Sequence, residues 1–208
     1  MKIQVVMLKQ DDPKKCSAEK LVKFGLAKKV RKTSDTTLIL NPFAKKTLLP
    51  SDKSLITSIT AIDCSWSFAE QTFANKLSGI HRKLPPLFAG NPVNYSKIGK
   101  LTTVEAISAA LYILGNDEIG NQLLDKFKWG HTFYELNQNL IKDYLNLESE
   151  DKIDQILKEY HIQTSSKNWN FIIECEKFSC FALNIHLKLN SIHELCDFLD
   201  FQDKYKKL

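Results

Sequence analysis

The stretch Leu55-Ile-Thr-Ser-Ile-Thr-Ala-Ile62 is aliphatic or β-branched at most positions, and Asp63-Cys64-Ser65-Trp66 follows it directly. A short apolar run of this kind is typical of a strand buried inside a sheet. Ligands of open α/β sheets gather beyond the carboxyl ends of the strands, so the run predicts a site at residues 63–66. The alternative is structural, with Asp63 capping a helix that starts near Ser65 and Trp66 filling the core.

Two further segments, residues 2–8 and 37–40, have the same aliphatic character and predict buried strands. Between them, Ser17 to Phe24 predicts a short helix with Ser17 as its cap. Thr102 and Glu105 are spaced as a capping box, and the alanine-rich run behind them predicts a helix that ends at Gly115. Further helices are expected at residues 117–127, 131–145 and 149–160. This mixture of strands and helices predicts an α/β fold.

The sequence pattern changes after about residue 165. Residues 170–175 and 180–187 predict two strands and residues 192–201 a last helix, so a small β/α appendage is expected. At 208 residues the chain is long enough for one domain, or for one of about 150 residues plus an appendage. The predicted parts are a basic N-terminal α/β portion at 1–53, a central portion with the C-terminal helices at 54–160, and the appendage at 161–208.

The cysteines and the apolar runs indicate a compartment. The five cysteines are scattered and contain no CxxC pair, which argues against a disulfide framework and against a zinc site. No run approaches the roughly 18 apolar residues of a membrane span, and the first apolar run is too short for a signal peptide. We therefore expect a cytoplasmic protein that binds neither a metal nor a membrane.

Positive charge is concentrated at the N-terminal end. Residues 1–53 contain 13 Lys/Arg and 5 Asp/Glu, a net charge of +8, whereas residues 136–208 contain 9 and 12, a net charge of −3. Such an asymmetry is typical of a face that binds phosphates, because each neutralised phosphate releases counterions. A lysine-rich surface that is merely solvated would give the same pattern.

Several common motifs are absent from the sequence. The seven glycines never form GxG and GxxxxGK[ST] does not occur, so neither a dinucleotide fingerprint nor a phosphate loop is present. HExxH and GxSxG are also missing, which argues against a metallohydrolase or a serine hydrolase. A nucleotide-like cofactor would therefore need another binding architecture.

Four segments resemble the ribosomal-RNA aminocarboxypropyltransferase family. They are Asp-Pro-Lys-Lys-Cys-Ser at 12–17, Ala-Ile-Asp-Cys-Ser-Trp at 61–66, Arg-Lys-Leu-Pro-Pro-Leu-Phe-Ala-Gly-Asn-Pro-Val-Asn-Tyr at 82–95 and Lys-Leu-Thr-Thr-Val-Glu-Ala-Ile-Ser-Ala-Ala-Leu-Tyr-Ile-Leu-Gly at 100–115. The resemblance covers about residues 1–150. It implies an S-adenosylmethionine-dependent enzyme with a knotted α/β domain similar to the SPOUT-type RNA methyltransferases, in which apolar loops wrap the cofactor.

The resemblance also implies the reaction. Such an enzyme transfers the 3-amino-3-carboxypropyl group to N3 of an N1-methylpseudouridine in small-subunit rRNA and releases methylthioadenosine. Asp63 is the candidate that accepts the N3 proton or orients the base, and Trp66 is the candidate wall beside the sulfonium. The other candidate cofactor residues are Leu38, Leu40, Leu87, Phe88, Ala89, Leu101, Thr102 and Thr103. For the aliphatic ones, plain core packing is an equal alternative.

The expected partner is small-subunit rRNA or a pre-ribosomal particle, bound by a monomer. The candidate phosphate contacts are basic residues of the N-terminal portion and one further arginine: Lys14, Lys15, Lys20, Lys23, Lys28, Lys29, Arg31 and Arg82. Two other functions stay open at this point. One is a methyltransferase of the same fold class, which would transfer the methyl group, and the other is a non-catalytic assembly factor that binds pre-ribosomal RNA.

Overall fold

The computed structural model describes residues 1–8, 16–74 and 77–162. The chain divides into two compact units, Met1–Glu159 and Tyr160–Leu208, and nearly all of the second lies outside the described residues. The strands and the helix predicted between residues 170 and 201 lie outside them as well. The division of the chain into parts at 1–53, 54–160 and 161–208 remains a prediction.

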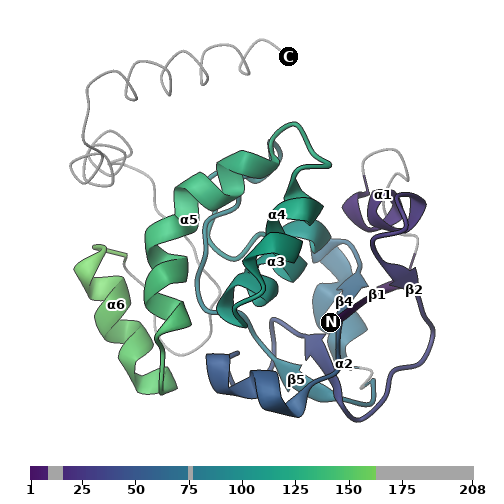
Figure 1. The fold of residues 1–208 in the computed structure, drawn as a ribbon, viewed down its shortest axis with the longest axis horizontal. Coiled ribbons are helices and arrows are strands. Elements are labelled where there is room, and N and C mark those ends of the chain that lie inside the picture. The colour runs from purple at the N-terminus through teal and green to yellow at the C-terminus, as the bar shows by residue number, and fades with distance from the viewer. Residues whose placement is uncertain (9–15, 75–76, 163–208) are drawn as a thin grey trace. The chain divides into compact units, whose positions relative to one another are not determined.

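Five parallel strands form one sheet in the order β2-β1-β4-β3-β5 (Figure 1). The strands are β1 Lys2–Met7, β2 Lys28–Lys29, β3 Thr37–Leu40, β4 Ser58–Asp63 and β5 Ile80–Arg82. β4 lies in the centre, where Asp63 pairs with Met7 and Ala61 pairs with Leu40. The parallel sheet confirms the α/β class and brings the carboxyl ends of β1, β3 and β4 to one edge, where Asp63 lies.

β1 and β3 confirm two predicted strands, whereas the third strand starts later than expected. Pro50–Leu55 forms a 3-10 helix, η1, so Leu55 belongs to that helix and β4 begins at Ser58. Proline favours the first turn of a helix because its φ is already helical and it lacks an N–H to satisfy. Asp52 completes the turn, since its Oδ2 accepts a hydrogen bond from Leu49 N at 3.1 Å.

Helices follow the strands, as the sequence pattern predicts. The described chain contains α1 Ser17–Lys23, η2 Trp66–Phe68, α2 Ala69–Ala74, α3 Thr103–Ile113, α4 Asp117–Leu124, α5 Gly130–Leu145, η3 Glu150–Lys152 and α6 Ile153–Glu159. The predicted cap of α1 was wrong. Cys16 precedes the first turn with extended backbone, and its sulfur accepts a hydrogen bond from Glu19 N at 3.2 Å. Ser17 lies inside the helix, and its Oγ accepts a hydrogen bond from Val104 N.

α3 is the core helix of the fold and lies between α5 and the sheet (Figure 1). It is buried along almost its whole length and packs against α1, α4, α5 and β4. Small side chains at Ser108, Ala109 and Ala110 let these neighbours approach closely. No described helix is long and apolar enough to cross a membrane.

Candidate active site

Asp63 ends β4 and is held by two side chains from other elements. Cys16 Sγ donates a hydrogen bond to Oδ2 at 3.1 Å, and Thr103 Oγ1 donates one to Oδ1 at 2.9 Å. Asp63 is buried, with an exposed fraction of 8%. The following helix, η2, has no side-chain cap, so the alternative in which Asp63 caps a helix near Ser65 was wrong. The carboxylate is placed where the starts of α1 and α3 meet the end of β4.

Glu105 of α3 joins the apolar loop at residues 84–99 to the start of α3. Its fully buried carboxylate accepts five hydrogen bonds, from Gly90 N, Asn91 N, Asn91 Nδ2, Thr102 N and Thr102 Oγ1, at 2.7 to 2.9 Å. Burial raises the pKa of Glu105, and the hydrogen bonds oppose that shift. The bonds to Thr102 confirm the predicted capping box.

α5 holds the same loop from the other side. Asn137 is fully buried; its Oδ1 accepts a hydrogen bond from Phe88 N and its Nδ2 donates one to Phe88 O, both at 2.8 Å. Tyr144 Oη donates a hydrogen bond to Pro86 O at 3.0 Å. Gly90 approaches α5 so closely that a Cβ there would lie 2.5 Å from Phe133 N. Residues 86–91 of the loop are therefore held by α3 on one side and by α5 on the other.

The candidate cofactor residues fall into two groups. Leu38, Leu40, Leu87, Phe88 and Ala89 are buried in β3 and in the loop. Core packing explains their burial, and their contact with a cofactor stays a prediction.

The second group lies at the start of α3, beside Asp63. Leu101, Thr102 and Thr103 are half-buried. Thr103 donates to Asp63, whereas Thr102 donates to Glu105. Within this group, Thr103 is the residue that contacts the candidate catalytic carboxylate.

Trp66 presents its ring to solvent. It is 39% exposed, so the alternative in which it fills the core was wrong. Lys100 Nζ lies over the ring, 4.5 Å from its centroid, which shows that the ring is positioned to hold a cation. A sulfonium is also a cation, so an exposed tryptophan beside a carboxylate fits the chemistry of S-adenosylmethionine.

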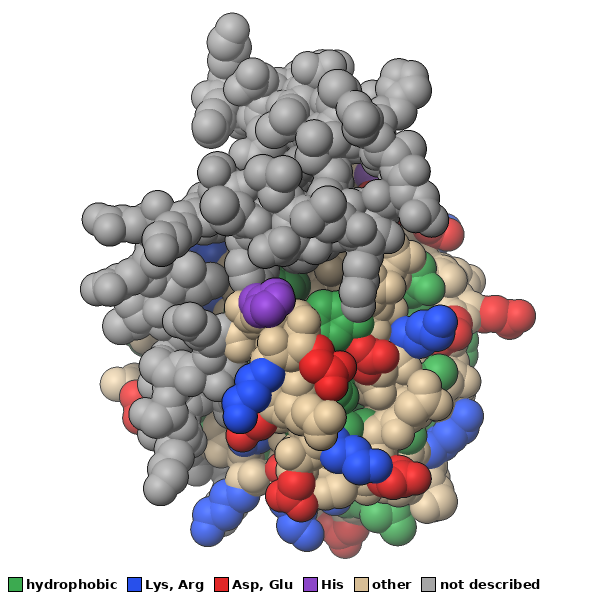
Figure 2. Space-filling view, turned by 90° about the vertical axis from the view of Figure 1, so that its left-hand side faces the viewer, with side chains coloured by type: hydrophobic (Ala, Val, Ile, Leu, Met, Phe, Trp, Pro, Cys, Tyr) green, Lys and Arg blue, Asp and Glu red, His purple; other side chains and the backbone are tan. Residues whose placement is uncertain are grey.

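The basic candidates gather on α1 and on the edge strand β2. Lys23, Lys28, Lys29 and Arg31 are exposed, while Lys20 is half-buried with its Nζ 5.7 Å from the centroid of the Phe127 ring. Lys14 and Lys15 lie outside the described residues. A different surface covers α5 and α6, where Figure 2 shows acidic and basic side chains interspersed.

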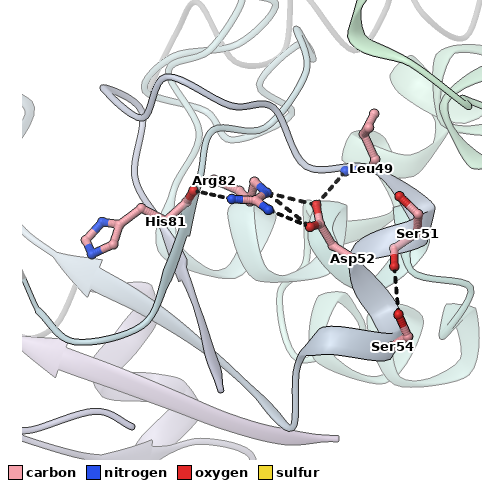
Figure 3. Close-up of polar contacts among 6 residues, drawn as sticks. All are labelled: Leu49, Ser51, Asp52, Ser54, His81 and Arg82. Carbon is pink, nitrogen blue, oxygen red and sulfur yellow. Dashed lines mark hydrogen bonds and ion pairs between the residues drawn. The ribbon is translucent and has the colours of Figure 1, made fainter. Parts of the chain in front are cut away.

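Arg82 differs from the other basic candidates, because its guanidinium is used inside the fold (Figure 3). Its Nε and Nη2 donate to the Asp52 carboxylate at 2.8 to 3.1 Å, and its Nη1 donates to His81 O at 3.0 Å. The ion pair ties β5 to η1, and both side chains are largely buried. A phosphate contact from Arg82 stays a prediction, since the observed role is structural.

A protein-family model described as "Ribosome biogenesis protein, C-terminal" matches residues 38–161. The 16S rRNA aminocarboxypropyltransferase of Methanococcoides burtonii is 42% identical to this chain and covers 76% of it and 94% of the relative's own length. The chain belongs to the 16S rRNA aminocarboxypropyltransferase family. Family members from Sulfurisphaera tokodaii and Saccharolobus islandicus are 42% and 44% identical, each over 76% of this chain and 95% of their own.

A solved structure of the family has the same fold. The SAM-dependent rRNA:acp-transferase Tsr3 from Vulcanisaeta distributa matches 76% of this chain and 96% of its own with a TM-score of 0.65 and 33% identity. A second family model, described as "Possible Fer4-like domain in RNase L inhibitor, RLI", matches residues 1–35. Iron–sulfur clusters are held by sets of four cysteines, and this segment contains only Cys16, so it lacks the ligands for such a cluster.

Sequence reasoning did not identify every residue at the site of this family member. Cys16 lies in the segment at 12–17 that carries part of the family resemblance, and that position was the available signal. Lys100 begins the segment at 100–115, but nothing in the local pattern indicates that its ammonium group lies over Trp66. Both contacts join parts of the chain that are distant in sequence, so only the fold brings them together.

Proposed function

We propose that this chain transfers the 3-amino-3-carboxypropyl group of S-adenosylmethionine to a base of small-subunit rRNA. The observation that carries the proposal is the family membership together with the arrangement of Asp63 and Trp66 at one edge of the sheet. The described carboxylate, the exposed aromatic ring and the basic surface on α1 and β2 are the three parts that such a reaction needs. The partner is rRNA or a pre-ribosomal particle, and the charge of α1 and β2 supports RNA binding there.

The finer proposal concerns the atoms. When bound, S-adenosylmethionine supplies a sulfonium whose aminocarboxypropyl methylene forms the new bond to N3 of N1-methylpseudouridine, while the C–S electron pair leaves with methylthioadenosine. N3 must lose its proton, and Asp63 is the group that accepts this proton or orients the base. We assign Trp66 to the sulfonium side of the cofactor because its ring already lies under a cation, and Leu101 to Thr103 to the cofactor pocket because they are half-buried at the start of α3.

Other parts of the proposal concern the chain as a whole. A knotted SPOUT-like path is supported by the parallel sheet and by the apolar loop fixed between α3 and α5. A cytoplasmic location is supported by Cys16, a buried thiol that forms no disulfide. We propose that the protein acts as a monomer.

The group that arrives on the RNA tests the proposed function. Substrate rRNA is incubated with cofactor labelled in the carboxyl position or, in parallel, in the methyl position, and the modified nucleoside is analysed by mass spectrometry. We expect the carboxyl label and the mass of an aminocarboxypropyl group on the nucleoside, with methylthioadenosine as the by-product. Arrival of the methyl label with release of S-adenosylhomocysteine would make the protein a methyltransferase, and no transfer would favour a non-catalytic assembly factor.

A further inference from the structure

Asp63 is anchored by neutral groups. Among the described residues, the two donors to its carboxylate are a thiol and a hydroxyl, and neither ion pair involves Asp63. By contrast, the similarly buried Asp52 is paired with the guanidinium of Arg82. A neutral anchor fixes the position of a carboxylate without cancelling its charge. Such an anchor suits a group that has to accept a proton or face a positive charge.

Cys16 makes two contacts at once. Its sulfur accepts a hydrogen bond from Glu19 N at 3.2 Å, which caps α1, and it donates to Asp63 Oδ2 at 3.1 Å. Burial raises the pKa of Cys16 to about 11, so near neutral pH the thiol keeps the proton that it donates. The backbone of α1 therefore determines where the sulfur lies, and the sulfur in turn determines where the carboxylate lies.

The junction is closed by a third contact. Ser17 Oγ accepts a hydrogen bond from Val104 N at 3.3 Å, which joins the start of α1 to the start of α3. Thr103, the first residue of α3, is the second donor to Asp63. α1 and α3 thus hold the carboxylate at the end of β4, and α1 also carries the exposed Lys23 of the basic surface.

We infer that Cys16 is a positioning residue, which together with Thr103 holds the Asp63 carboxylate in the orientation that the substrate base requires. The inference rests on the proposed function. A carboxylate that loses one of two anchoring donors can rotate, and misplacement by about 1 Å is enough to lower a rate strongly. Cys16 acts through Asp63 and touches neither the base nor the cofactor.

The test compares Cys16→Ala, which removes the thiol, with Cys16→Ser, which keeps a donor and a preferred helix cap. In single turnovers at saturating RNA and cofactor, Cys16→Ala should be roughly ten- to hundredfold slower, with little change in either dissociation constant. Cys16→Ser should recover most of that loss. Ser149→Ala is the matched control, because Ser149 caps η3 by accepting from Asp151 N, away from Asp63. It should lose a cap without losing rate.

A second measurement does not depend on activity. Unfolding equilibria of Cys16→Ala, Asp63→Asn and the double variant form a cycle that reports whether the two side chains interact. We expect the double variant to deviate from the product of the single effects by about fivefold or more. The inference is overturned if the double variant's effect equals the product of the single effects, or if Cys16→Ala reacts at the wild-type rate. A wild-type protein that transfers nothing while the cycle shows coupling overturns the proposed function instead, and with it the positioning role.

Discussion

The sheet side of the molecule and the helical side use polar groups differently. On the helical side, Glu105 and Asn137 are fully buried, and their side chains hydrogen-bond to the loop at residues 84–99 and, for Asn137, also to Phe133 O of α5. On the sheet side, two neutral donors hold Asp63 among the described residues, and Trp66, Lys23 and the lysines of β2 are exposed. Polar groups whose hydrogen bonds are all made inside the protein stabilise the fold. Polar groups that still have hydrogen-bonding capacity or face solvent are able to bind a substrate.

The surface charge follows the same division. Residues 16–32 contain six Lys/Arg and one Glu, whereas residues 135–159 contain three Lys and seven Asp/Glu. RNA carries a phosphate at every nucleotide, so it is attracted to the first region and repelled by the second. The helical side therefore supports the loops, and we propose that the sheet side meets the substrate.

The largest expected effect lies on the helical side. Glu105→Ala should lower the free energy of unfolding by about 3 kcal/mol or more, because five donors lose their common acceptor inside the core. Denaturant unfolding measures the change. Glu118→Ala, in the exposed first turn of α4, is the control and should cost little. A Glu105 variant as stable as the wild type would show that water replaces the carboxylate and that the division between the sides is weaker.

Asp63→Asn should give the next effect, and it should appear in the rate. The amide keeps the shape of the side chain but cannot accept a proton, so the single-turnover rate should fall by roughly a hundredfold. Cofactor and RNA affinities should change little. Rapid-quench measurement of product decides the point, with Asp117→Asn on α4 as the control. An unchanged rate would reduce Asp63 to a structural residue.

Charge reversal compares the two surfaces directly. The triple variant Lys23→Glu, Lys28→Glu, Arg31→Glu should bind RNA roughly thirtyfold more weakly. The slope of its logarithmic binding constant against the logarithm of the salt concentration should fall by the amount expected for about three lost phosphate contacts. Cofactor affinity should stay nearly constant, because phosphate contacts act on RNA alone. Binding is measured by titration at several salt concentrations.

The matched control makes the same charge change on the other surface. It carries Glu at Lys142, Lys152 and Lys158, which are exposed on or beside α5 and α6. We expect a much smaller loss of RNA affinity from this variant. Equal losses in both triple variants would mean that net charge, and not the α1 and β2 surface, controls RNA binding.

The smallest of these effects is expected for the cofactor. Trp66→Ala should raise the dissociation constant of S-adenosylmethionine about tenfold, because the aromatic wall and its attraction for a cation are lost together. Phe68→Ala, an exposed aromatic in the same 3-10 helix, is the control. Calorimetric titration compares the two variants. If Trp66→Ala binds the cofactor as tightly as Phe68→Ala, Trp66 does not contact it.

Local patterns predicted most of the described elements. The aliphatic runs at 2–8 and 37–40 became β1 and β3, and the capping box at Thr102 and Glu105 starts α3. These features depend on neighbours within a few residues, so they can be seen in the sequence. The start of β4 was missed because Pro50 begins a 3-10 helix that includes Leu55. The cap of α1 was missed because Cys16, which is not a usual cap residue, precedes the more usual Ser17.

The resemblance to the family, the α/β class, the excess of positive charge at the N-terminal end and the candidate carboxylate Asp63 could all be read from the sequence. The side chains that hold Asp63, the ion pair of Arg82 with Asp52 and the position of Lys100 over Trp66 became visible only in the folded structure. The physical reason is distance along the chain. Cys16 is 47 residues from Asp63 and Thr103 is 40 residues from it, so packing of α1 and α3 against the end of β4 has to bring them together.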